Sequence, residues 1–179
     1  EVWFDRTGLP FVAPSPILQS FPAIILYTGL VPFEATNLSV GRGTDEAFRR
    51  IGAPWMDPAR VIAILKDRPI RGVRFSPVDF TPVSPGDNKY PGQLVHGIRI
   101  EVTERSQLQT TRLAAGLLSA IHRAYPTELT IDTTRFDRLF GSPRARQAIM
   151  RGADADAVVD STYGPAYAFR QRVAKYLIY

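Results

Sequence analysis

The chain contains 179 residues, of which 45% are hydrophobic and 22% are charged, with a net charge of +5. These values are typical of one ordinary globular domain and exclude a disordered chain, because enough apolar surface is present to form a core. No run reaches the ~20 apolar residues that a membrane-spanning helix needs. The lack of cysteine excludes disulfides, thiolate metal sites and a cysteine nucleophile.

The charged and titratable residues exclude further classes of protein. Two histidines, His96 and His122, are too few for a multi-histidine zinc site, so we expect no metal and no cofactor. The basic residues are scattered rather than arranged in a stripe, and no aromatic-interleaved RNA-binding pattern occurs, so a nucleic-acid partner is the weakest hypothesis. Arginine, which supplies most of the positive charge, suits a carboxylated ligand.

The first third of the chain is rich in proline and glycine, and residues 7–16 are expected to form an extended entry segment with Pro16 opening a short helix. The apolar run 23–27 could be a buried strand or a helical turn, because periodicity does not distinguish the two. Residues 34–44 have the composition of a loop. Residues 59–68 form a predicted helix, since Asp57 is a good N-cap, Pro58 suits the first turn and Pro69 ends the pattern.

Two strands follow, at 72–81 with a break at Pro77 and at 93–103 with a bulge at Gly97. The proline-rich segment 82–91 between them is predicted to be a surface loop. Apolar residues at helical spacing predict helices in the rest of the chain, at 110–125, 134–140, 143–151, 154–160 and 165–176. The pattern predicts one domain, 1–179, of α+β class, with a small mixed or antiparallel sheet packed against several helices.

The strongest candidate for a functional site is the segment FEATNLSVGRGT, residues 33–44. It gathers a carboxylate, an amide, hydroxyls and a guanidinium, and two glycines allow unusual backbone angles on both sides of the arginine. The candidate ligand-binding residues in it are Glu34, Thr36, Asn37, Ser39 and Arg42. The same residues could instead only order the loop, through turn caps and an Arg42–Glu34 pair, and composition leaves both interpretations open.

Trp55 lies close to this segment in the sequence and could provide a stacking platform for a sugar or anchor the start of a helix in the core. Glycoside hydrolysis needs two carboxylates on opposite sides of the bond. Glu34 is the one acid of the polar segment, and the acids elsewhere in the sequence show no pattern of a catalytic acid/base pair. The catalytic residues are therefore not identified from this sequence.

A series of motifs together resembles the C-terminal region of the NamZ-type exo-β-N-acetylmuramidases, formerly the YbbC-like proteins, and this resemblance runs along essentially the whole chain. The motifs are GLPFVAPSP (8–16), Tyr-x-Gly (27–29), FEATNLSVGRGT (33–44), IGAPW (51–55), KYPGQLVHGIRIEVTE (89–104) and RQRVAKYLIY (170–179).

The resemblance implies a two-domain enzyme that releases N-acetylmuramic acid from the non-reducing end of peptidoglycan fragments. It places the catalytic carboxylates on an N-terminal Rossmann-like domain that this sequence lacks, so the fragment alone is expected to be inactive. The expected partners are that domain and a peptidoglycan-derived sugar, bound by Glu34, Thr36, Asn37, Ser39, Arg42 and Trp55, and the expected location is periplasmic or secreted. The alternative function is a non-catalytic glycan-binding or protein-interaction module.

Overall fold

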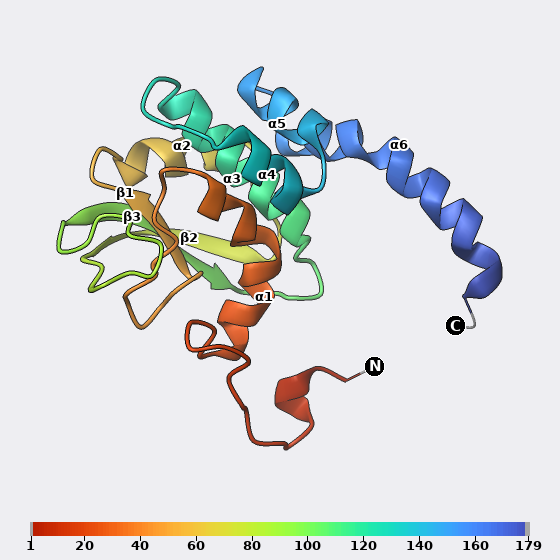
Figure 1. The fold of residues 1–179 in the computed structure, drawn as a ribbon, viewed down its shortest axis with the longest axis horizontal. Helices are drawn as coiled ribbons and strands as arrows, with labels where there is room; N and C mark the ends of the chain where they lie inside the picture. Colours follow the sequence, from red (N-terminus) through yellow and green to blue (C-terminus); the bar gives the residue numbers. More distant parts are fainter. Residues whose placement is uncertain (1, 178–179) are drawn as a thin grey trace.

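The computed structural model of the protein describes residues 2–177 and contains a three-stranded antiparallel sheet with helices packed beside it (Figure 1). This arrangement confirms the predicted α+β class. The strands are β1 (Arg50–Ala53), β2 (Val73–Phe80) and β3 (Val95–Val102), and the helices are α1 (Phe21–Leu30), α2 (Pro58–Asp67), α3 (Thr110–Ala124), α4 (Thr133–Phe140), α5 (Pro143–Met150) and α6 (Ala155–Val173), with short 3-10 helices η1 (Phe4–Arg6), η2 (Val31–Ala35) and η3 (Ala174–Tyr176).

The sheet has the order β1-β3-β2, so β3 is the central strand. Side chains alternate between its two faces, and Ile98 and Ile100 on one face are fully buried. Ile51 on β1 stands opposite Ile98 on the same face. Helix α2 contacts β2 and β3 and also packs on α3, so these apolar side chains and the apolar faces of α2 and α3 belong to one core.

Two predictions about the strands are wrong. Strand β2 runs without a break through Pro77, which is aligned with Ile98 of β3. Because β2 is an edge strand, the missing N–H of proline can face away from the ladder. The predicted bulge at Gly97 is absent too, since Gly97 stays in register with Gly52 on one side and Val78 on the other.

The ambiguous apolar run 23–27 lies within helix α1. Ser20 caps this helix by accepting a hydrogen bond from the N–H of Ala23 (3.4 Å), and Pro22 lies in its first turn. The predicted helices at 59–68 and 110–125 are confirmed as α2 and α3. Strand β1 was not predicted, because its four residues are too few to show alternation.

The C-terminal part of the chain differs from the two helices predicted at 154–160 and 165–176. Helix α6 is continuous from Ala155 to Val173 and passes through Gly164 and Pro165. A proline inside a helix removes one backbone hydrogen bond, but it does not always end the helix. The rings of Tyr163 and Tyr167 stack across this turn, with centroids 6.0 Å apart.

Candidate functional site

The candidate segment 33–44 is held between two distant parts of the chain. At one end Thr36 forms an isolated β-bridge with Ile131, just before α4. At the other end Ser39 pairs with Gly52 of β1, where the N–H of each residue donates to the carbonyl of the other at 2.8 and 3.0 Å. The segment is therefore an ordered strap fixed to the edge of the sheet rather than a free loop.

Two of the predicted ligand-binding residues have buried hydroxyl groups. Thr36 Oγ1 donates to the carbonyl of Phe33 (2.7 Å) and accepts from the N–H of Leu38 (3.1 Å). Ser39 is fully buried, and its Oγ accepts from the N–H of Gly41 (3.2 Å). These hydroxyls stabilise turns of the strap itself, as the alternative interpretation of the sequence proposed.

The amide of Asn37 binds the strap to the segment before α4. Its Nδ2 donates to the carbonyl of Glu128 (2.8 Å), and its Oδ1 accepts from the N–H of Thr130 (3.0 Å). The backbone N–H of Asn37 also donates to the carbonyl of Thr130 (3.2 Å). Both ends of the side chain are occupied in this way, and the residue remains half-buried.

Glu34 and Arg42 form an ion pair across the strap. Arg42 Nε donates to Glu34 Oε1 at 2.7 Å, and its Nη2 contacts the same oxygen. Arg135 of α4 approaches the other oxygen of Glu34 at 3.5 Å. The Arg42 guanidinium also lies over the ring of Phe48, 5.6 Å from its centroid. The Arg42 and Glu34 side chains keep 19% and 10% of their surface exposed, so the pair borders solvent.

The glycines on both sides of Arg42 adopt backbone angles that other residues avoid. Gly41 and Gly43 have φ of 76° and 78°, as the sequence pattern predicts. A Cβ on Gly43 would lie 2.6 Å from the carbonyl oxygen of Val83, so the strap also packs closely on the 82–92 segment. Arg42 therefore lies on a tight turn, between two glycines that pack closely against neighbouring residues.

Lys89 was not among the predicted site residues, although it contacts the strap most extensively. Its Nζ donates to the carbonyl oxygens of Phe33 (3.3 Å), Glu34 (3.2 Å) and Leu38 (2.8 Å). Burial lowers the pKa of Lys89 to about 8, although the carboxylates of Asp87 and Glu34 oppose the shift. A single lysine in a proline-rich segment gives no sequence signal for such a role.

The lowered pKa of Lys89 predicts a stability that rises in alkaline solution. Between about pH 8 and pH 10.5 the unfolded chain holds a proton that the folded chain has released, so the unfolding free energy increases with pH, by up to about 3 kcal/mol. Urea unfolding at pH 7.5 and pH 10 measures this gain. We expect Lys89→Met to lose it, and an equal gain in that variant would contradict the prediction.

The residue after Lys89 connects the strap to Trp55. The hydroxyl of Tyr90 donates to the carbonyl of Asn37 (2.7 Å), and it accepts a hydrogen bond from the Trp55 side chain. Burial raises the pKa of Tyr90, and the bond from Trp55 opposes that shift. The half-buried Trp55 ring also packs edge-on against Tyr125, with centroids 5.3 Å apart. Trp55 thus has the anchoring role and remains partly exposed.

The charges around the strap leave an excess of positive charge. Arg42, Arg135 and Lys89 face two carboxylates, Glu34 and Asp87. A partly exposed guanidinium fork in such surroundings is suited to a carboxylate ligand, which it can bind through two parallel hydrogen bonds. The arrangement provides recognition groups, and of its two largely buried acids Glu34 is already paired with arginine.

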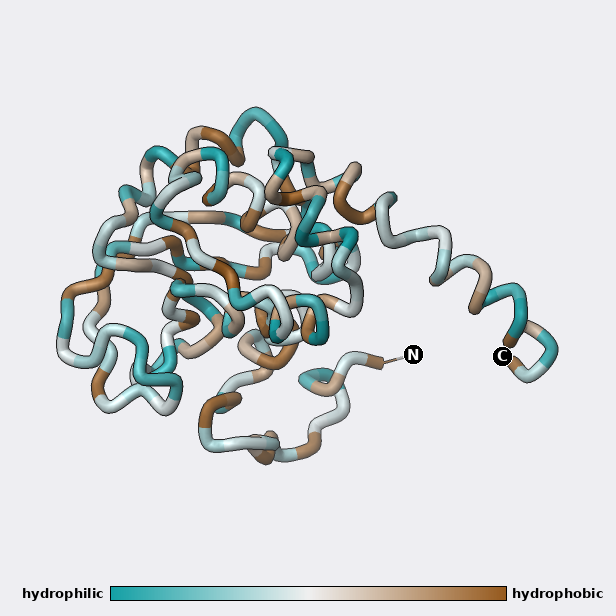
Figure 2. Tube along the Cα trace, turned by 45° about the horizontal axis from the view of Figure 1, so that its top comes forward, coloured by the Kyte–Doolittle hydropathy of each residue, from teal (hydrophilic) through white to brown (hydrophobic). Residues whose placement is uncertain are grey.

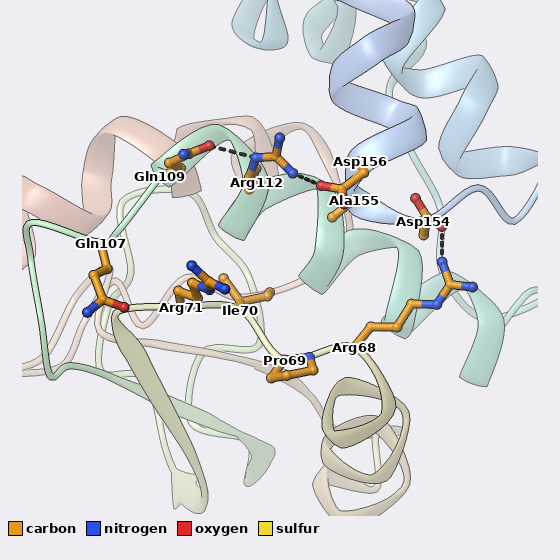
Figure 3. Close-up of a pocket in the computed structure, with 10 residues that line it drawn as sticks. All are labelled: Arg68, Pro69, Ile70, Arg71, Gln107, Gln109, Arg112, Asp154, Ala155 and Asp156. Atoms are coloured by element: carbon orange, nitrogen blue, oxygen red, sulfur yellow. Dashed lines mark hydrogen bonds and ion pairs between the residues drawn. The ribbon is translucent and has the colours of Figure 1, made fainter.

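A cavity of about 580 Å³ lies elsewhere, where the end of α2 meets the starts of α3 and α6 (Figure 3). Arg68 pairs with Asp154 across it, and Arg112 pairs with Asp156. None of the predicted site residues is among those that line the cavity, which are Arg68, Pro69, Ile70, Arg71, Gln107, Gln109, Arg112, Asp154, Ala155 and Asp156.

Residues 2–177 contain neither a cluster of metal-binding side chains nor a helix able to span a membrane. No group of three or more histidine, aspartate or glutamate side chains in this part of the chain could hold a metal ion. Over the same residues, no helix combines the length and apolar character that crossing a membrane requires.

Comparison with known proteins identifies relatives over nearly the whole chain. Residues 25–179 match the family described as exo-beta-N-acetylmuramidase NamZ, C-terminal. The chain is 34% identical to the peptidoglycan beta-N-acetylmuramidase NamZ of Bacillus subtilis (strain 168), over 98% of this chain and 42% of that protein.

Two crystal structures of DUF1343 family proteins from Bacteroides fragilis NCTC 9343 share the fold. The first has a TM-score of 0.85 at 20% identity, covering all of this chain and 48% of that one. The second has a TM-score of 0.65 at 24% identity, covering 93% of this chain and 43% of that one. The chain therefore spans less than half the length of each of these relatives.

The fold is that of the two DUF1343 proteins. In this chain the α+β domain carries an arginine-containing strap at the edge of its sheet. Within that class the chain belongs to the NamZ exo-β-N-acetylmuramidase family and corresponds to its C-terminal domain.

Proposed function

We propose that this chain forms one wall of the substrate cleft in a peptidoglycan-processing exo-β-N-acetylmuramidase, which releases N-acetylmuramic acid from the non-reducing end of its glycan. Family membership and the activity named for the Bacillus subtilis relative support this proposal. The observation that carries it is the partly exposed Arg42–Glu34 pair, with Arg135 beside it. A peptidoglycan substrate further favours a periplasmic or secreted protein.

Arg42 is the residue that we assign to recognition of the substrate's negative charge. N-acetylmuramic acid carries a lactyl carboxylate, and a guanidinium fork binds a carboxylate through two hydrogen bonds. In the structure described, Glu34 occupies this fork. Arg135 provides Glu34 with a second cation when a substrate carboxylate takes its place on Arg42.

The other predicted residues divide into two roles. The half-buried Asn37 and Trp55 are assigned to contact with the sugar, since the face of an indole ring suits the C–H face of a pyranose. Thr36 and Ser39 are buried, and we assign them to holding the strap in shape. Both groups depend on Lys89 and Tyr90, which bind the backbone of the strap from the 82–92 segment.

The bond-breaking carboxylates are assigned to the domain that precedes this one in the longer relatives. In this chain Glu34 is the acid of the strap, and two arginines neutralise it. Both of its oxygens are thus engaged by arginines, and no second carboxylate of the strap stands opposite it, as the pair of a glycosidase requires. The isolated chain is therefore expected to be inactive, with hydrolysis found in the full-length protein.

The decisive variant is Arg42→Ala in the full-length enzyme, assayed with a muropeptide substrate. Loss of a charge-assisted contact should raise KM and lower kcat/KM by about 100-fold, which corresponds to roughly 3 kcal/mol. Arg42→Lys retains the ion pair with Glu34 but not the fork, so it should fold normally and still show a raised KM. Arg123→Ala, at an exposed position of α3, is the matched control. Unchanged kinetics in Arg42→Ala would refute the assignment.

A further inference from the structure

The C-terminal half of helix α6 extends away from the body of the domain, and Figures 1 and 2 both show it as a projecting arm. Among the residues of this helix, Val158 near its start is the one that is fully buried. Large apolar side chains beyond it are exposed, with Tyr163 at 59%, Tyr167 at 52% and Phe169 at 55%. We refer to residues 163–177 as the C-terminal arm.

The domain body leaves the aromatic side chains of the arm uncovered, since Tyr163, Tyr167 and Phe169 are all exposed. Near its start α6 packs on α3 and α5. At 3.6 residues per turn Phe169 lies over the same face as Val158, whereas Tyr163 and Tyr167 lie on the opposite face. Tyr176 is 70% exposed. Large exposed apolar side chains gathered on one projecting helix mark an interaction surface.

The arm is also poorly suited to remain helical alone. Pro165 removes a backbone hydrogen bond close to the point where the helix leaves the domain. Isolated helices of this length are marginal in water, because most helical stability comes from packing of the apolar face. Contact with another surface supplies the apolar packing that the domain body does not give to the arm.

The relatives indicate which surface this is. More than half the length of each relative lies outside the region that this chain matches, and the matched family is the C-terminal one. The remaining residues of these relatives therefore precede the matched region. The N-terminal segment runs below the body in both views, and its end turns toward the end of the arm (Figures 1 and 2). Val2, Leu9 and Val12 of this segment are exposed.

The charges of the arm define the chemistry of its partner. Residues 161–177 contain no acid, and they carry Arg170 and Arg172 on α6 and Lys175 on η3. The Arg172 guanidinium lies 5.5 Å from the Phe169 ring centroid. Aromatic rings flanked by cations complement an apolar groove with an acidic rim.

We propose that the C-terminal arm docks into an apolar, acid-rimmed groove on the preceding domain of the same full-length chain and holds the two domains together. This inference rests on the two-domain arrangement within the proposed function, and it does not depend on the sugar that is bound. The arm acts as a clasp: its helix starts on the core of one domain and buries its aromatic side chains on the other.

Hydrogen exchange on the full-length protein tests the clasp. The amides of residues 166–175 should exchange at least about tenfold more slowly than in an unstructured peptide. The double variant Tyr167→Ser, Phe169→Ser should lose this protection, and Arg170→Glu with Arg172→Glu should weaken it. Met150→Ser, which removes an exposed apolar side chain from α5, is the matched control and should leave the protection unchanged.

Two outcomes would overturn the proposal. Unprotected amides in the wild-type arm would show that nothing covers it. Protection that falls on dilution, together with a dimer in sedimentation that the double variant abolishes, would assign the arm to a second copy instead. Arg42→Ala separates the two proposals, because wild-type kinetics in that variant with a protected arm would reject the sugar-binding assignment and leave the clasp standing.

Discussion

Gly97→Ala is expected to lower the unfolding free energy by roughly 3 kcal/mol, a large effect for the addition of one methyl group. Gly97 lies in the central strand β3, opposite Gly52 of β1. A Cβ at this position would lie 2.5 Å from the carbonyl oxygen of Ile51 and 3.0 Å from the Phe80 ring. Relief requires the backbone of β1 to move, and Ser39 of the strap is hydrogen-bonded to that strand.

Urea unfolding of the purified protein measures this change, and Gly164→Ala is its matched control. Gly164 lies in helix α6 with no atom within 4 Å of an added Cβ. Alanine there should change the stability by no more than about 1 kcal/mol, because its better helix propensity is opposed by the clash of a Cβ with the ring of the following Pro165. If Gly97→Ala lost no more stability than Gly164→Ala, the backbones of β1 and β3 would be farther apart than described.

Glu46→Gln should have the other large effect, a loss of roughly 3 kcal/mol or more in unfolding free energy. Arg50 and Arg99 stand opposite each other on β1 and β3, an unfavourable placement for like charges. The carboxylate of Glu46 contacts both, and it pairs with Arg49 at 3.0 Å as well. Removing its charge leaves arginines on one face of the sheet without their shared counter-ion.

Acid titration provides a second measurement of the same cluster. Burial alone would raise the pKa of Glu46, but hydrogen bonds and charges from Arg50, Arg99 and Arg49 outweigh it and hold the pKa below its usual value. The stabilisation is thus complete above the ordinary glutamate pKa and is lost as the pH falls through the lowered one. Glu46→Gln should remove this acid dependence.

Glu101→Gln is the control for this cluster, because Glu101 forms an exposed pair with Arg74. Surface pairs of this kind contribute at most about 1 kcal/mol. Equal losses in the two variants would mean that Glu46 is no more than another surface charge.

Local sequence patterns predicted most of the helices, because capping residues and apolar spacing act within one segment. Asp57 and Pro58 start α2 as expected, and the apolar stripe of α3 predicted its length to within one residue. Strand β1 could not be predicted, since its position depends on pairing with β3, far along the chain. The break expected at Pro77 is absent because β2 is an edge strand, and edge strands tolerate proline.

The candidate site was predictable in composition but not in geometry. The strap, its two glycines with positive φ and the Arg42–Glu34 pair all follow from the polar, glycine-rich pattern. Lys89 and Tyr90 could not be foreseen, because each acts on backbone carbonyls more than 50 residues away. Whether the strap binds a sugar remains the prediction that Arg42→Ala tests.

The anchoring of Asn37 has a consequence for the order in which the protein forms during synthesis. Its side chain binds the backbone of Glu128 and Thr130, which lie 91 and 93 residues further along the chain. Domains fold as their residues leave the ribosome, and contacts between distant residues close late. The strap leaves the ribosome early but is completed only when the segment before α4 has emerged, so the candidate site should be among the last parts of the domain to mature.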